Sequence, residues 1–235
     1  MDRVVEKWNP DRLGKQYLRD AINSISGYFF DWVNTVDICG EKKEPYSSII
    51  DVKNDIVLSF NYTETIESIY GMDSSSICYI HGQRETDPQL RIEKSKSTFG
   101  KNNTELIVGF AEKYVNNILK SKNKGVLMNL LKRTEENIVY HRDFFDRLKR
   151  ENIKEIYSFG LSFSDADMPY IKTICDIMQT NNRDIDMIWY IAPYGCFFKR
   201  FREKVHFINC IKNSGFRGKI RVLGVNLCIR CYLFV

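Results

Sequence analysis

The feature that most constrains the fold of this chain is a regular alternation of short apolar runs with stretches of helical spacing. Strands are expected near residues 55–60, 77–80, 105–109, 155–160, 185–191 and 219–225. Apolar residues spaced three and four apart predict helices over 13–36, 63–70, 126–148, 164–180 and 198–211. Because the strand runs are apolar throughout, both faces of each strand are expected to be covered. The pattern predicts an α/β, Rossmann-like fold, with a mainly parallel sheet and helices on both faces.

No linker or repeat divides the 235 residues, so we expect a single domain spanning 1–235. Gly27 is a candidate break in the first helix, and Thr63 is a candidate N-cap of the second. The start, MDRVVEKWNP, has no apolar signal segment, and no run of about 18 apolar residues could span a membrane. The seven cysteines, with Cys228 and Cys231 as an isolated pair, then indicate reduced thiols and a cytoplasmic protein.

Polar residues directly follow two of the predicted strands. Asn61 ends the run VLSFN, and His81 with Gly82 ends the run YIHG. Ligands of parallel sheets bind beyond the carboxyl ends of the strands, so these residues are expected on one side of the fold. Asn61 either ties down the strand-to-helix turn or hydrogen-bonds a ribose or a water. His81 is either structural or a general acid or base, and Gly82 would let a ligand approach the backbone.

A third strand end carries the stretch GLSFSDAD, residues 160–167. Gly160, Ser162 and Asp165 suit a helix cap with a ribose or phosphate contact, because they offer hydroxyl and carboxylate groups at a helix start. Ser164 stands where the nucleophile elbow G-x-S-x-G requires glycine, which disfavours a serine hydrolase. A metal-binding D-x-D motif made by Asp165 and Asp167 is an alternative, but carboxylates from other strand ends are not evident.

The remaining charged features are interpreted as surface. The stretch 199–221 holds eight Lys or Arg residues and one Glu, and a solvated helix face is expected there. An acidic or nucleic-acid partner is the alternative, although the formal charge of +5 is mild and makes nucleic acid an unexpected partner. His141 and His206 lie in helical patterns and are expected at the surface or at an interface.

The stretches LSFNYTETIESIY, ICYIHGQ, LIVGF and IYSFGLSFSDADMPYI, with FFDWVNTV before them, resemble the AbiH-type bacteriophage abortive infection family over most of residues 15–200. That family is similar in turn to sirtuin-like NAD-binding domains. The resemblance implies an antiphage effector that binds a nucleotide, NAD, as its ligand or substrate. It further implies catalytic roles for Asn61 and His81, and a cofactor-binding set made of Gly82, Gly160, Ser162 and Asp165.

The resemblance also implies an early glycine-rich turn that holds a pyrophosphate at the start of a helix. Before Asn61 the glycines are Gly14, Gly27 and Gly40, and none of them follows an apolar strand. We therefore expect an N-terminally truncated member that hydrolyses NAD poorly. The tail beyond Gly215 also departs from the usual family ending, and an open sheet position would favour a homo-oligomer or another partner.

Three functions are compatible with the sequence. The first is an NAD glycohydrolase in which His81 deprotonates water or a ribose hydroxyl while Asn61 holds it. The second is a nucleotide-binding sensor or interaction module without turnover, which responds to a phage-derived trigger. The third is a metal-dependent, nuclease-like effector that uses Asp165 and Asp167.

Overall fold

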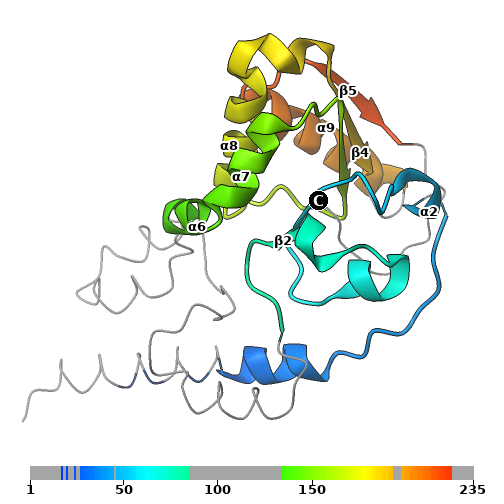
Figure 1. The fold of residues 1–235 in the computed structure, drawn as a ribbon, viewed down its shortest axis with the longest axis vertical. Helices are drawn as coiled ribbons and strands as arrows, with labels where there is room; N and C mark the ends of the chain where they lie inside the picture. The colour runs from blue at the N-terminus through cyan, green and yellow to red at the C-terminus, as the bar shows by residue number, and fades with distance from the viewer. Residues whose placement is uncertain are drawn as a thin grey trace, which may run out of the picture. The chain divides into compact units, whose positions relative to one another are not determined.

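The computed structural model describes residues 17, 20, 24, 27–44, 46–84, 134–192 and 197–223 (Figure 1). The chain divides into two compact units, Met1–Thr35 with Glu85–Lys132 and Val36–Arg84 with Arg133–Val235. The expected single domain stays a prediction. The expected strand at 105–109, the helical pattern over 126–133, and the pair Cys228 and Cys231 lie outside the described residues.

The described part of the first unit is helical at residues 17, 20 and 24 and over the run 27–35. Gly27 is the first residue of the described helical run, and residues 25 and 26 before it lie outside the described residues, so the break expected there stays a prediction. A lone glycine costs a helix only about 1 kcal/mol. The rings of Phe29 and Trp32 lie 5.7 Å apart, and Val33 is buried.

All strand pairing in the described residues is parallel, and it lies in the second unit. In one sheet β1 (Val57–Ser59) pairs with β2 (Ile77–Tyr79), and in the other β4 (Ile188–Ala192) lies between β3 (Glu155–Phe159) and β5 (Lys219–Val222). The α/β class and the parallel pairing are confirmed. The strands form two sheets rather than the single sheet expected, because β1 and β3 are not paired within the described residues.

The helices that precede or follow these strands are α2 (Tyr46–Ile49), η1 (Ile66–Tyr70), η2 (Ser74–Ser76), α6 (Thr134–Tyr140), α7 (Arg142–Arg150), α8 (Met168–Gln179), η4 (Thr180–Asp186) and α9 (Phe197–Asn213). Of these, η1, the pair α6 and α7, α8 and α9 lie where helices were expected, whereas the short α2, η2 and η4 were not predicted. The N-cap of η1 is Thr65 and not Thr63, whose hydroxyl lies 3.0 Å from that of Thr65. Pro169 occupies the first turn of α8, where its missing N–H has no intrahelical partner to lose. The described cysteines are free thiols.

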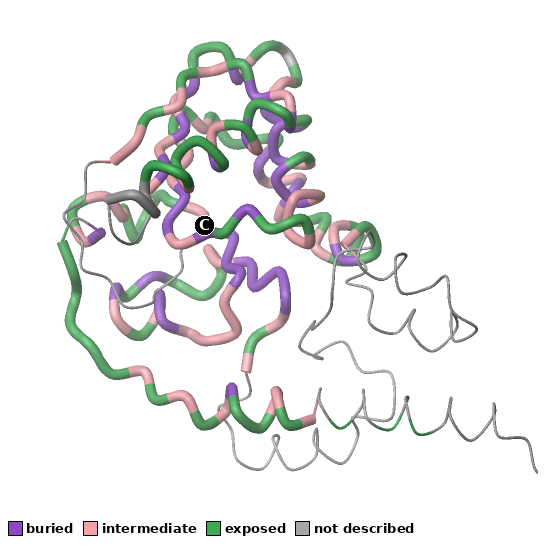
Figure 2. Tube along the Cα trace, turned by 180° about the vertical axis from the view of Figure 1, so that it is seen from behind, coloured by how far each residue is buried: buried purple, intermediate pink, exposed green. Residues whose placement is uncertain are grey.

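Alternation along the strands sends side chains to two apolar clusters on opposite faces. Trp189 and Ile191 of β4 join buried residues of α7, α8 and α9 in the larger cluster. Phe159 of β3 joins Tyr46 of α2 and Tyr70 of η1 in the smaller one. Strands β1 and β2 contribute to both clusters, so the two sheets share the same apolar interior although no strand pair joins them. Buried residues alternate with exposed ones along the described chain (Figure 2).

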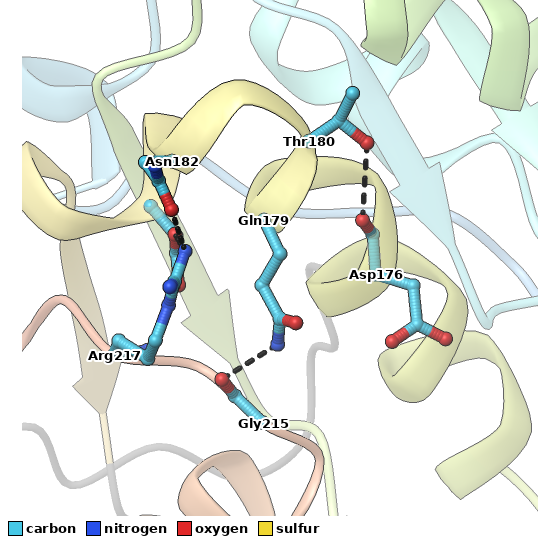
Figure 3. A network of polar contacts seen from close by, with 7 residues as sticks. Asp176, Gln179, Thr180, Asn182, Gly215 and Arg217 are labelled. Atoms are coloured by element: carbon cyan, nitrogen blue, oxygen red, sulfur yellow. Dashed lines mark hydrogen bonds and ion pairs between the residues drawn. The ribbon is translucent and has the colours of Figure 1, made fainter.

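An ion pair between the buried Asp184 and the half-exposed Arg217 fastens η4 to the loop between α9 and β5. Asp184 is fully buried, and its Oδ2 accepts hydrogen bonds from the backbone N and the Nε of Arg217 at 3.1 and 3.0 Å. Arg217 also donates to Asn182, and beside it Gln179 donates to the carbonyl of Gly215 (Figure 3). Hydrogen bonding from Arg217 lowers the pKa of Asp184, so the carboxylate is charged although it is buried.

Replacement of Arg217 by Met is expected to lower the free energy of unfolding at pH 7 by about 3 kcal/mol, because it leaves a buried carboxylate without its counter-charge. Because the folded-state pKa of Asp184 is lowered, its stabilising contribution exists above the unfolded pKa and is lost as the pH falls through the folded value. Urea unfolding of both proteins from pH 7 to pH 3 should therefore show the difference shrinking below about pH 4. Arg221→Met, at an exposed cation of β5, is the control.

Gly218 is expected to tolerate no side chain. A Cβ there would lie 2.3 Å from the carbonyl oxygen of Asp184 and 2.6 Å from that of Met187, and both atoms are backbone. Gly218→Ala should therefore reduce stability by at least about 3 kcal/mol in urea unfolding, since overpacking against a fixed backbone forces larger shifts. Gly40→Ala is the matched control, because its Cβ would meet Ile69 at an ordinary 3.5 Å. Equal losses in the two variants would contradict this account.

Candidate functional site

The loops that follow β1 and β2 are tied together by Arg84. Its backbone N–H donates to the carbonyl of Tyr62 at 2.7 Å, and its Nε donates to Glu64 at 2.8 Å. The guanidinium also reaches the carbonyl of Val36. These bonds fix the ends of the two strands, which carry Asn61 and His81, relative to each other. Sequence reasoning missed Arg84, because a single arginine after a strand carries no recognisable motif.

The segment after β3 alternates between buried and exposed side chains. Leu161 and Phe163 are each 2% exposed, so Ser162 and Ser164 between and after them face solvent. The chain turns at Gly160, whose φ of 66° is a conformation that glycine adopts without strain. Phe163 also has a positive φ, 50°, and its ring lies 4.8 Å from that of Phe207. Packing of an aromatic side chain thus maintains a backbone conformation that is unusual for a residue with a Cβ.

His81 lies at the carboxyl end of β2 and is only 3% exposed. Its ring is surrounded by those of Phe60, Tyr62 and Tyr170, whose centroids lie 5.3, 6.1 and 5.6 Å away. Its Nε2 lies 3.3 Å from Oδ1 of Asp167, at the start of α8. The histidine therefore joins three chain segments that are far apart in the sequence. Aromatic rings therefore enclose the side chain, and the catalytic role expected of His81 stays a prediction.

Asp167, not Asp165, is the acidic residue that faces His81. Asp167 is the N-cap residue of α8, but its side chain makes no capping hydrogen bond. Its Oδ2 instead accepts a hydrogen bond from the hydroxyl of Ser164 at 2.7 Å. Asp165 is exposed, as is Ser162. The expected helix-capping role of Asp165 is wrong, since the N-cap position belongs to Asp167.

A buried amide supports the strand end that carries His81. Asn137 of α6 is 5% exposed, and its Nδ2 donates to the carbonyl of Ile80 and, at 2.9 Å, to the hydroxyl of Tyr170. Tyr170 is fully buried, and burial raises its pKa to about 12. Burial and the nearby Asp167 also raise the pKa of Tyr62. Both phenols are therefore protonated at neutral pH. Asn137 was missed because nothing in its helical context distinguishes it.

The other two histidines differ from each other. His141, at the N-terminal end of α7, is half-buried, and its Nδ1 lies 3.4 Å from the Sγ of Cys78. Burial, and then the proximity of His81, lower the pKa of His141. This histidine is thus more enclosed than an open surface position, and the expected surface or interface position stays a prediction. His206 is exposed, as expected. Burial also raises the pKa of Cys78 to about 12, which makes this thiol unreactive at neutral pH.

The predicted site residues are thus distributed over one end of the strands. Asn61, Gly82 and Gly160 are half-buried, and Gly82, like Gly160, has a positive φ. The backbone N–H of Asn61 donates to the hydroxyl of Ser59 at 3.2 Å, so this N–H group in the turn after β1 has a hydrogen-bond partner. Within the part of the chain that the structure describes, no three His, Cys, Asp or Glu side chains gather closely enough to hold a metal ion. Nor does any described helix have the length and apolar character needed to cross a membrane.

The fold and the site define an α/β protein with a buried histidine–aspartate pair where parallel strands end. Residues 6–189 match the family model described as bacteriophage abortive infection AbiH. Because this match covers most of the 235 residues, the chain belongs to the AbiH family, and its role is in abortive infection, an antiphage defence. No curated protein and no solved structure matched the chain. The family resemblance is thereby confirmed, whereas the sirtuin-like relation stays a prediction.

Removal of the Asn137 amide is expected to destabilise this end of the fold. Asn137→Ala leaves the hydroxyl of Tyr170 and the carbonyl of Ile80 without the bonds described above, which should cost about 2 kcal/mol or more. Urea unfolding measures the loss, with Asn152→Ala as the control at an exposed asparagine before β3. A loss no larger than that of the control would show that water replaces the amide.

Proposed function

We propose that this AbiH protein is a nucleotide-binding effector that acts at the strand ends around His81, with NAD as its ligand and cleavage of the nicotinamide–ribose bond as its reaction. The observation that supports this best is the convergence of three distant segments on the His81 ring: Tyr62 after β1, His81 after β2, and Asp167 after β3. Ligands of parallel α/β folds bind at this end of the strands. The cytoplasm, where NAD is present, is the proposed location.

The residues at this end suit the ribose part of a dinucleotide better than its phosphates. Asp165 and Asp167 place two carboxylates before the first turn of α8, where they occupy the region that would otherwise attract an anion. A carboxylate or a serine hydroxyl, such as that of the exposed Ser162, can pair with a ribose hydroxyl. Gly82 and Gly160 add backbone without side chains, which a ligand can approach closely.

The proposed reaction needs one general base. The bond between C1′ of the ribose and the nicotinamide nitrogen breaks, and nicotinamide leaves with the electron pair as a neutral molecule. Water adds to C1′ of the oxocarbenium-like ribose, and His81 takes the proton that the water loses. Asn61, at the neighbouring strand end, would orient that water or a ribose hydroxyl. Since His81 is 3% exposed, the reaction requires the surrounding side chains to move when the ligand binds.

That same burial favours a second candidate function, a nucleotide-binding module without turnover. A histidine enclosed by three aromatic rings and paired with a carboxylate is a stable structural arrangement in its own right. In that case the strand ends would still bind NAD without cleaving it. The chain would then act as a sensor that responds to a phage-derived trigger and passes the signal to a partner or to a second copy of the chain.

Incubation of the purified chain with millimolar NAD, followed by chromatography of nicotinamide, separates the two functions. We expect slow release that His81→Gln reduces at least about 100-fold, the usual contribution of a general base. The glutamine amide can still hydrogen-bond to Asp167, which limits damage to the fold. His206→Gln, at an exposed histidine of α9, is the control and should release nicotinamide at the unchanged rate.

Calorimetric binding of NAD without any release would support the non-catalytic module and overturn the hydrolase. Absence of both binding and release would overturn the assignment of NAD altogether. Cleavage of nucleic acid that depends on a divalent metal and is lost in Asp165→Asn and Asp167→Asn would instead support the nuclease-like alternative.

A further inference from the structure

We infer that Asp167 is the positioning residue of the site, which orients His81 so that Nε2 carries a hydrogen and Nδ1 is the nitrogen that exchanges protons. This role rests on the proposed function of His81 as a general base. The contact itself is a property of the fold, and it can be tested whether or not NAD is cleaved.

The geometry assigns the two carboxylate oxygens of Asp167 to different partners. Oδ2 accepts the hydrogen bond of the Ser164 hydroxyl at 2.7 Å, which fixes the rotation of the carboxylate. Oδ1 then lies 3.3 Å from Nε2 of His81, slightly longer than the usual N–H···O hydrogen bond. The carboxylate is 13% exposed and the imidazole 3%, so the pair is shielded from most of the solvent.

A carboxylate can only accept, so the nitrogen facing it must be protonated. In neutral His81 this leaves the lone pair on Nδ1. Because Nδ1 is buried, proton uptake there requires the surrounding side chains to move. The negative charge also favours the imidazolium form once a proton has been taken up, as an opposite charge within a few ångströms does. A histidine held in one tautomer by a carboxylate is a common arrangement of a general base.

The position of Asp167 explains why this residue rather than its neighbour takes the role. Ser164, Asp165 and Asp167 all lie between Phe163, which is buried, and α8, which begins at Met168. The backbone N–H groups of Asp167 and Met168 both donate to the carbonyl of Ser164, at 2.9 and 3.1 Å. This tight turn brings the Asp167 side chain back toward Ser164 and His81, whereas Asp165, at the outside of the turn, is exposed.

Other titratable groups face His81 as well, and their charges must be considered beside that of Asp167. Tyr62 follows β1, Tyr170 lies in α8, and His141 lies at the start of α7. Both tyrosines have raised pKa values and are neutral at neutral pH, and the lowered pKa of His141 makes it neutral as well. These three groups are therefore uncharged near neutral pH, and Asp167 is the carboxylate that faces His81.

The test is ¹⁵N NMR of the full chain, in which three histidines, His81, His141 and His206, give signals that substitution assigns. We expect neutral His81 to be the Nε2–H tautomer. Asp167→Asn should lower the pKa of His81 by at least about one unit, because it removes an opposite charge at hydrogen-bond distance. It should also mix the two tautomers, since an amide can donate to Nε2 as well as accept from it.

Asp165→Asn, two residues away and exposed, is the matched control, and it should leave both the tautomer and the pKa of His81 as they were. Ser164→Ala should shift the His81 signals in the same direction as Asp167→Asn but by less, because it frees the rotation of the carboxylate without removing it. Ser162→Ala is the control for that variant. Folding of each variant is checked from the dispersion of its amide spectrum.

The inference is overturned if Asp167→Asn alters His81 no more than Asp165→Asn does, or if wild-type His81 is the Nδ1–H tautomer. These outcomes are independent of the NAD assay. If Asp167→Asn shifts the tautomer and the pKa as expected while the wild type releases no nicotinamide, the orienting contact is supported and the proposed reaction alone fails.

Discussion

Parallel strand pairing is the constraint on which the rest of the second unit depends. It aligns β1 with β2 and β3 with β4 and β5, so that within each sheet every strand leaves at the same edge. Side chains then alternate between a cluster with α7, α8 and α9 and a cluster with α2 and η1. Beyond the carboxyl ends of the strands the alternation stops. Polar groups there are still surrounded by apolar side chains. Such groups cost free energy unless they are hydrogen-bonded.

The chain meets that requirement with side chains from helices. His81 lies beside Asp167 from the start of α8, and Asn137 from α6 satisfies the carbonyl just before it and the Tyr170 hydroxyl. Arg84 closes the loops after β1 and β2. Each of these partners comes from a different element. Loss of any one of them leaves the polar group that it contacts without its hydrogen bond in apolar surroundings. Interdependence of this kind specifies one arrangement more strongly than it adds stability.

The fold class and strand positions could be predicted from the sequence because burial on two faces leaves a direct pattern, as in IDMIWYI and EIYSFG. The strand ends Asn61, His81 and Gly160 could be placed for the same reason. The side chains that contact these strand ends could not be predicted. Asp165 and Asp167 look equivalent in SDAD, and only the turn made by Ser164 decides which one faces inward. Asn137 and the rings that enclose His81 come from elements distant in sequence, so their proximity is a tertiary fact without a local signal.

Two carboxylates lie at the N-terminal end of α8. A helix N-terminus attracts anions, and a free one would suit a phosphate. Here Asp167 already stands at the N-cap with Asp165 beside it, and Asp167 faces His81. The helix dipole therefore stabilises the carboxylate that faces the histidine, and a phosphate would meet two like charges. The same residues can accept hydrogen bonds from ribose hydroxyls without that repulsion. The start of α8 is thus better suited to orienting His81 and to recognising sugar hydroxyls than to holding a pyrophosphate, and any dinucleotide bound here would need to place its phosphates away from this helix.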